Sequence, residues 1–351
     1  MKPVTDQILF KEIDNGSLLV FRVVWGVLMT IECWGGLLTG WVRNTFLLPK
    51  YTFTFIGFEW TEHLLGTPIY FLYFLLGLMG VLIAIGLNYR IATIVFAIGW
   101  TLTYLMQKIH YNNHFYLLVL ISWMMVFLPA NTDQSYDVRF EPEIRSSSMP
   151  NWIRLLFMFQ VSVMYFFAAV AKLYPGWMSG DFLSLRFIHT ANWLEYQIGL
   201  KGLAEFFREK WFAATIARLG FLFDLLIVPL LLLRHTRKVA LFALLIFHLF
   251  NSLSLNIGVF PYVALALTVF FFPPETIRNQ FFATHPKYTN ANQSTQYKTL
   301  ITTILVVYSV WQLYLPLRHW LIPGEVLWTE EGHRMSWRMM LRSRQGTIDY
   351  F

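Results

Sequence analysis

Residues 69–87 read IYFLYFLLGLMGVLIAIGL, a run that contains no charged side chain. An α-helix needs roughly 20 apolar residues to cross about 30 Å of hydrocarbon, so this run has the length of one membrane crossing. It is followed by NYR, in which Arg90 is the first charged residue. The run therefore predicts a transmembrane helix.

Similar apolar runs recur along the whole chain. Of its 351 residues, 56% are hydrophobic and 13% are charged, which is about half the charged fraction of a typical soluble domain. We therefore predict an all-α, polytopic integral membrane protein with about nine transmembrane helices. The predicted spans are 17–38, 69–87, 91–109, 114–129, 152–172, 212–233, 239–256, 257–273 and 298–317.

The stretches outside these runs predict how the chain is organised. Residues 182–210 are amphipathic, which is typical of helices that lie at the membrane interface. We assign residues 1–317 to a transmembrane domain and expect residues 318–351 to leave the membrane as the start of a truncated domain. The N-terminus lacks a cationic region followed by an apolar core, so we expect the first span to target the protein.

Basic residues in the short loops predict the orientation. A cytoplasmic N-terminus places Arg90 and the basic loops at 139–154 and 234–238 inside, as the positive-inside rule favours. The C-terminal segment is then non-cytoplasmic. The net charge of +7 is scattered over the ends of spans, so we expect a lipid bilayer as partner and no nucleic acid.

This topology predicts that unusual polar residues from several spans meet at the outer end of the bundle. Ionisable groups within a span are energetically expensive, which makes them candidates for function. The residues concerned are Asn113 and His114 in the fourth span, Lys172 at the end of the fifth, His248 and Asn251 in the seventh, and Asn256 after it.

Several of these residues also have a structural interpretation. Lys172 could extend to the headgroups, and His114 could be an ordinary interface residue. His248 and Asn251 share one helix face and could form a hydrogen bond between helices. We interpret Asp224, near the middle of its span, as a buried partner for a polar group of a neighbouring helix.

A metal centre has little support in the sequence. His110 and His114 are spaced as a possible pair of metal ligands, but no acidic or cysteine ligand accompanies them. We therefore predict no metal site.

Several blocks occur in a characteristic order: YNNHFYLLVL (111–120), YFFAAVAKLYPGW (165–177), HLFNSLSLNIGVFPY (248–262) and WTEEGHRMSWRMMLRSR (328–344). With these blocks the chain resembles the vitamin K-dependent γ-glutamyl carboxylases and their bacterial relatives, the HTTM proteins. The similarity runs from about residue 17 to 346.

The resemblance implies a reaction in which a vitamin K-type hydroquinone is deprotonated and reacts with O2 to give the epoxide. The strong base formed on the way removes a γ-proton from a glutamyl side chain, and CO2 traps the carbanion. The resemblance implies Lys172 and His114 as catalytic residues. It implies quinone contacts for Asn113, His248, Asn251, Asn256, Trp337, Met339 and Met340, and substrate contacts for His333, Arg342 and Arg344.

An ammonium cannot accept a proton, so the role of Lys172 requires a neutral amine, which an apolar pocket favours. The chain also departs from the family pattern. Ala171 stands where animal enzymes have a second lysine, His333 replaces a tyrosine, and Arg342 replaces a histidine. The large lumenal domain that holds a substrate propeptide is expected to be absent, so quinone chemistry is better supported than carboxylation.

The leading hypothesis is thus a bacterial inner-membrane enzyme with its active site toward the non-cytoplasmic side. Its expected co-substrates are a reduced vitamin K-type quinone, O2 and CO2, without a metal, and its expected partners are a quinol and a glutamyl-containing protein or peptide. The alternative is a non-catalytic membrane protein that binds a quinone or lipid. A transporter would need an inverted repeat, which the sequence does not show.

Overall fold

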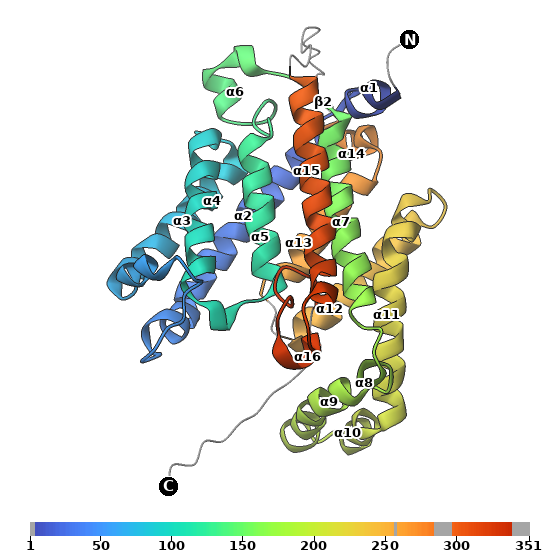
Figure 1. The fold of residues 1–351 in the computed structure, drawn as a ribbon. Helices are drawn as coiled ribbons and strands as arrows, with labels where there is room; N and C mark the ends of the chain where they lie inside the picture. Colours follow the sequence, from blue (N-terminus) through green and yellow to red (C-terminus); the bar gives the residue numbers. More distant parts are fainter. Residues whose placement is uncertain (1–3, 256–257, 284–296, 339–351) are drawn as a thin grey trace. The chain divides into compact units, whose positions relative to one another are not determined.

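The computed structural model describes residues 4–255, 258–283 and 297–338, and these are mostly helical (Figure 1). Each predicted apolar segment is helical over most of its described residues. The architecture is therefore that of a polytopic membrane protein. Six helices are long and apolar enough to cross a membrane, namely α2 Gly16–Leu38, α3 Thr67–Ile85, α4 Tyr89–Met106, α7 Asn151–Val170, α11 Lys210–Leu232, and α15 Lys298–Leu317 with the short helix that extends it to Leu321.

Within the described residues, the number of candidate spans is six, or seven if one bent helix pair is counted, rather than about nine. The predicted span 257–273 begins as α13 Phe260–Leu267 and its 3₁₀ extension Thr268–Phe271. α14 Pro274–Phe281 then leaves at an angle of 114°. Two consecutive prolines, Pro273 and Pro274, lack the amide hydrogens that would continue the helix.

Two further predicted spans form helices that are not among these six. α5 Asn113–Phe127 has 15 residues, which cover only about 22 Å of helix axis. α12 Arg237–Leu255 corresponds to the seventh predicted span and borders the undescribed residues 256–257.

The chain divides into two compact units, Met1–Phe159 with Leu241–Val306, and Gln160–Ala240 with Val307–Phe351. The unit boundaries fall inside α7, α12 and α15.

The shorter helical elements are α1 Val4–Leu9, α6 Asp137–Phe140, the π-helical turn Arg43–Leu47, and the 3₁₀ turns Glu59–Leu64, Lys108–His110, Pro142–Ile144 and Arg318–Leu321.

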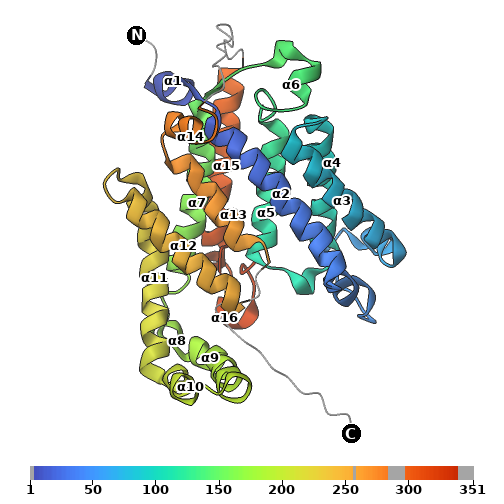
Figure 2. The same ribbon diagram turned by 180° about the vertical axis from the view of Figure 1, so that it is seen from behind.

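In the first unit, α2, α3, α4 and α5 lie side by side (Figures 1 and 2). α2 and α3 approach closely where two glycines face the opposite helix. A Cβ atom on Gly26 would lie 2.4 Å from the amide nitrogen of Ala84, and one on Gly80 would lie 2.6 Å from the hydroxyl of Thr30. Small residues of this kind let membrane helices pack backbone to backbone.

Among the described residues, one small sheet departs from the all-α expectation. β1 Glu12–Asp14 pairs antiparallel with β2 Ser148–Pro150. Beside it, the Arg278 side chain from α14 is 1% exposed and donates to carboxylates of Asp14 at 2.7 Å and Asp133 at 3.1 Å. This buried network ties the N-terminal segment, the loop after α5 and α14 together.

In the second unit, α8 Pro175–Met178, α9 Asp181–Trp193 and α10 Lys201–Arg208 pack near the start of α11 (Figure 1). A π-helical turn, Leu194–Ile198, joins α9 to α10. The predicted helices within 182–210 are thus confirmed, and their place at the membrane interface stays a prediction. Ala171, Trp177 and Ala217 form a small core, against which Leu327 of α16 Val326–Thr329 packs.

Candidate functional site

Lys172 lies in the turn that follows α7 and is only 8% exposed. Its ammonium donates to the carboxylate of Asp224 and lies 3.3 Å from the carbonyl oxygen of Ala168. A lysine that extends to lipid headgroups would instead leave its amine at the surface. The snorkelling interpretation is therefore wrong, because this amine is held inside the protein.

Asp224 supplies the opposite charge from the middle of α11 and is 5% exposed. Asp224 is a buried partner for a polar group, as its interpretation expected, although that group, Lys172, stands in the turn after α7 and not on a helix. Burying a lone carboxylate or ammonium costs several kcal/mol, whereas a hydrogen-bonded pair offsets much of that cost. Each side chain therefore offsets the cost of burying the charge of the other.

Trp177 covers the ammonium of Lys172 from α8. The distance from Nζ of Lys172 to the centroid of the Trp177 ring is 5.3 Å, within the range of a cation–π contact. The indole N–H donates to the carbonyl oxygen of Ala217 at 2.9 Å, which fixes the ring against α11. Pro175 at the first turn of α8 favours a helix start directly after the lysine.

The C-terminal block returns to the same unit. The hydroxyl of Ser336 donates to the carbonyl oxygen of Leu315 at 3.0 Å and so fastens the block to α15. Trp337 is fully buried, and Met335 and Trp337 both have φ of +58°, a left-handed conformation uncommon outside glycine. Such strained backbone persists where the surroundings hold it, and it clusters at functional sites.

This block comes within electrostatic range of the segment that follows Lys172. Burial raises the pKa of the Tyr174 phenol, and the positive charge of nearby Arg338 offsets part of that rise. Arg338 directly follows Trp337, and Tyr174 is two residues after Lys172. Within the second unit, the structure therefore brings the Lys172 turn and the block around Trp337 toward each other.

A second group of predicted residues gathers in the first unit. The ring of His114 stacks on Phe260, with 4.0 Å between centroids, and the ring of His248 approaches Phe260 at 6.0 Å and 75°. These side chains come from α5, α12 and α13. His248 is 1% exposed, so two of the predicted polar residues share a buried aromatic environment.

Asn113 lies beside this group at the start of α5 and is 4% exposed. Its side-chain oxygen accepts a hydrogen bond from the hydroxyl of Tyr111 at 2.8 Å. The neighbouring Asn112 caps the helix, because its side-chain oxygen accepts from the amide of Phe115 at 2.7 Å. The YNNH stretch therefore combines a helix cap with a held amide.

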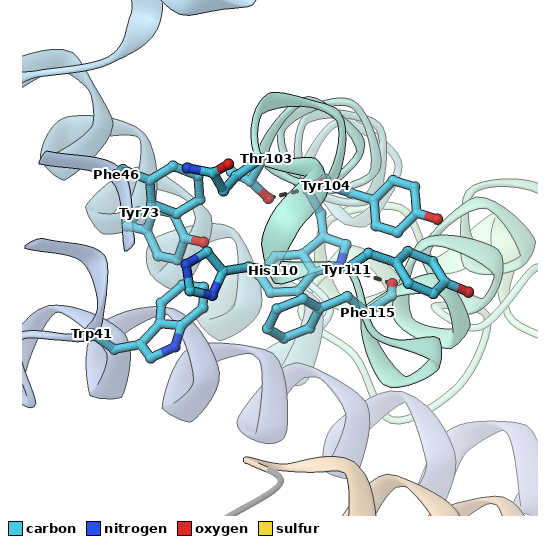
Figure 3. A pocket seen from close by; sticks show the side chains of 10 residues that line it. Trp41, Phe46, Tyr73, Thr103, Tyr104, His110, Tyr111 and Phe115 are labelled. Atoms are coloured by element: carbon cyan, nitrogen blue, oxygen red, sulfur yellow. Dashed lines mark hydrogen bonds between the residues drawn. The ribbon is translucent and has the colours of Figure 1, made fainter. Parts of the chain in front are cut away.

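Figure 3 shows a cavity that Tyr111 and Phe115 help to line and that is walled largely by aromatic side chains. His110 meets Trp41 edge-on there, with 6.4 Å between ring centroids. The cavity measures about 10 Å³, room for a single water molecule and far less than the space a small-molecule site provides. A quinone ring does not fit in it. Its walls are Trp41, Phe46, Tyr73, Trp100, Thr103, Tyr104, Gln107, His110, Tyr111 and Phe115.

One ionisable residue near the histidine group, Glu32, was not predicted as a site residue. Glu32 lies inside the apolar run of α2, and its carboxylate accepts from the amide of Val259 at 3.3 Å. Val259 directly precedes Phe260. A lone carboxylate within a predicted span is the signal that could have singled it out.

The predicted site residues divide between the two units. Lys172, His333 and Trp337 belong to the second unit, and Asn113, His114, His248 and Asn251 belong to the first. The convergence of both groups in one site stays a prediction. Asn256, Met339, Met340, Arg342 and Arg344 lie outside the described residues.

The chain matches two known sequence families. Residues 10–275 match the HTTM domain, and residues 297–351 match the vitamin K-dependent gamma-carboxylase, lumenal domain. The predicted C-terminal segment 318–351 falls within the second match. No solved structure matches the chain. The first match covers most of the chain, and the second covers its C-terminal part. The chain therefore belongs to the vitamin K-dependent gamma-carboxylase family.

Proposed function

We propose that this protein is a membrane enzyme that converts a vitamin K-type hydroquinone and O2 into the quinone epoxide and water, with Lys172 accepting the first proton. The observation that carries the proposal is the buried ion pair between Lys172 and Asp224 in a chain of this family. Coupled carboxylation of a glutamyl side chain by CO2 is the second half of the proposed reaction.

The hydrogen bond between Lys172 and Asp224 gives a route by which the paired lysine can act as a base. The Lys172 ammonium already carries its proton, so it cannot accept another. It can pass that proton to the Asp224 carboxylate, to which it donates a hydrogen bond, and the freed amine then accepts the proton of the hydroquinone hydroxyl. The pair changes from net neutral to net positive as the quinol becomes an anion.

This charge balance favours the deprotonated quinol. A positive pair in a buried setting stabilises a developing anion more strongly than it would in water. The Trp177 ring and the small core around it exclude water from the pair, which also suits a reaction that forms a strong oxygen base. Asp224 is therefore proposed as the partner that makes Lys172 a usable base.

Quinol contacts are proposed for the aromatic group in the first unit. A hydroquinone is an apolar ring with two hydroxyls, so it suits an apolar pocket edged by few polar groups. The stacked rings of His114 and Phe260, with His248 beside them, supply this chemistry. The family resemblance also supports Asn113, Asn251, Asn256, Trp337, Met339 and Met340 as quinol contacts, and His333, Arg342 and Arg344 as contacts to a glutamyl substrate.

The remaining parts of the proposal concern location. We propose a bacterial inner-membrane protein with a cytoplasmic N-terminus and an active site open to the non-cytoplasmic side. The basic loops that contain Arg90 and Arg139 support this orientation.

The test supplies the purified protein with hydroquinone, O2, CO2 and a glutamyl peptide, and measures epoxide and fixed carbon separately. We expect Lys172→Met to reduce epoxide formation by about 100-fold or more, a typical loss for a missing general base. Lys210→Met is the matched control, because Lys210 forms an exposed ion pair with Asp181 at 3.3 Å. Quinol binding without epoxide from the unmodified protein would instead establish a non-catalytic quinone binder.

A further inference from the structure

A second cavity, of about 420 Å³, lies in the first unit, where α2 begins and α3 ends. Its volume is in the range of small-molecule sites. Three arginines line it, Arg22 from α2, Arg139 from α6 and Arg145 from the segment that follows α6. None of them belongs to the candidate site described above, and three cations around one cavity point to an anionic ligand.

Arg22 forms the buried part of this cavity and is 1% exposed. Its guanidinium donates to the carbonyl oxygens of Ala130 at 2.9 Å and Gln134 at 2.6 Å. Carbonyl groups orient the guanidinium but do not neutralise it. No carboxylate lies within 4.0 Å of Arg22 in the described part of the chain, and its Nε atom has no hydrogen-bond partner there.

One carboxylate, that of Asp133, also lines the cavity, and Asp137 lies in the same region at the start of α6. The Asp133 carboxylate accepts from Arg278 at 3.1 Å, and the Asp137 carboxylate accepts from the backbone amide of Asn88 at 2.7 Å at the start of α4. Arg139 has no carboxylate within 4.0 Å among the residues that the structure describes, and lies over the ring of Tyr136. The residues that line the cavity thus include three guanidinium groups and one carboxylate, and that carboxylate is already paired with Arg278.

Apolar side chains continue from the cavity onto the outer surface of the spans. Val23 on α2 and Ile85 on α3 both line it and are 39% and 37% exposed. A ligand there meets guanidinium groups at one end and a hydrocarbon surface at the other. That combination suits an amphiphile with an anionic headgroup, and basic pockets between the ends of membrane helices are known to hold such lipids.

We propose that this cavity binds the phosphate group of an anionic membrane phospholipid, with the arginines on the phosphate and the acyl chains along Val23 and Ile85. Guanidinium groups bind phosphate through paired, charge-assisted hydrogen bonds. The inference is independent of the proposed quinol chemistry, because it rests on residues that take no part in it.

The test uses the full chain in a non-ionic detergent and three probes: phosphatidylglycerol, phosphatidylcholine with the same acyl chains, and inorganic phosphate. Binding is followed by native mass spectrometry and by the rise in unfolding temperature. We expect only phosphatidylglycerol to bind with saturation. The double variant Arg139→Gln/Arg145→Gln should weaken its binding by about tenfold or more, the effect of losing charge-assisted hydrogen bonds.

Two controls make the result specific. Arg43→Gln removes an exposed arginine near the other end of α2 and should leave lipid binding unchanged. Arg22 is kept in every variant because it holds the loop at 130–134. If the double variant does not fold, the single variant Arg139→Gln, at an exposed position, takes its place.

Three outcomes would overturn the proposal. Equal binding of phosphatidylcholine would show that headgroup charge is irrelevant. Equal loss of binding in Arg43→Gln would show that net charge rather than the cavity attracts the lipid. Saturable binding of inorganic phosphate that displaces phosphatidylglycerol at similar concentration would identify a free phosphate compound, rather than a lipid, as the ligand.

Discussion

The ammonium of Lys172 and the carboxylate of Asp224 form an ion pair across 52 positions of sequence, and their side chains are only 10% and 6% exposed. A pair buried this far serves stability poorly, since desolvation of both charges offsets most of their attraction. Stability alone therefore does not account for the pair, and the proposed proton transfer gives it a chemical role.

The first prediction concerns the stability of the pair. Lys172→Met leaves Asp224 buried and unpaired. Asp224→Leu likewise leaves Lys172 buried and unpaired. Each single variant should lower the free energy of unfolding by about 3–5 kcal/mol, because a lone buried charge remains. The double variant should lose much less than the sum of the two, since no charge is left behind. Unfolding in detergent measures all three.

The same variants test the role of the pair in the reaction. If the pair acts as the base, the double variant recovers stability but forms no epoxide. The exposed pair of Lys210 and Asp181 is the comparison, and its removal should change neither property, because solvent screens it. An active double variant would assign the proton transfer to other groups.

The second prediction concerns the contact between α2 and α3. Gly26→Ala places a methyl group 2.4 Å from the amide nitrogen of Ala84, so the helices must separate and the protein should unfold at a lower temperature. Gly35→Ala is the matched control on the same helix, where nothing lies within 4 Å of the new Cβ. It should be neutral or stabilising, because alanine favours helix over glycine by about 1 kcal/mol. Similar unfolding temperatures for both would contradict the close approach.

The apolar pattern predicted the helices well because membrane spans are specified by their own composition. The first span was predicted at 17–38 and is helical over Gly16–Leu38. The pattern says less about how far a helix continues in one direction. Residues 257–273 are as apolar as the other spans, yet the chain turns away at Pro273 and Pro274.

The candidate site was predictable only in part. The blocks around His114 and Lys172 carry family patterns, and the position of Asp224 inside a span marked it as a partner for a buried polar group. Its pairing with Lys172 has no local signal, because the two residues lie on different helices or turns. The arginine cavity was not predicted for the same reason. Arg139 and Arg145 line one cavity with Arg22 only when residues 130–145 are folded against α2 and α3.

The third prediction concerns the buried network of the first unit. Arg278→Leu leaves the carboxylates of Asp14 and Asp133 without the cation that they share, and both are nearly inaccessible. The free energy of unfolding should fall by about 3–5 kcal/mol. Arg208→Leu, which removes a more exposed pair with Glu195, is the control and should have a small effect. The network has no structural role if both variants unfold at the same temperature.

The fourth prediction concerns the ring of Phe260, on which His114 stacks at 4.0 Å. Phe260→Leu keeps an apolar side chain but removes the aromatic face. If the group binds the quinol ring, the KM for hydroquinone should rise by about 2- to 10-fold, the equivalent of one aromatic contact, with little change in kcat. Phe250→Leu, at a position on α12 that is 41% exposed, should leave KM unchanged.

A double-mutant cycle sharpens this test. His114→Ala and Phe260→Leu should raise KM by less together than the product of their separate effects, because the two rings form one contact surface. Independent, multiplicative effects would mean that the rings do not act on one ligand. A fall in kcat with KM unchanged would place Phe260 in the support of the fold or the chemical step, and would remove this group from the proposed quinol contacts.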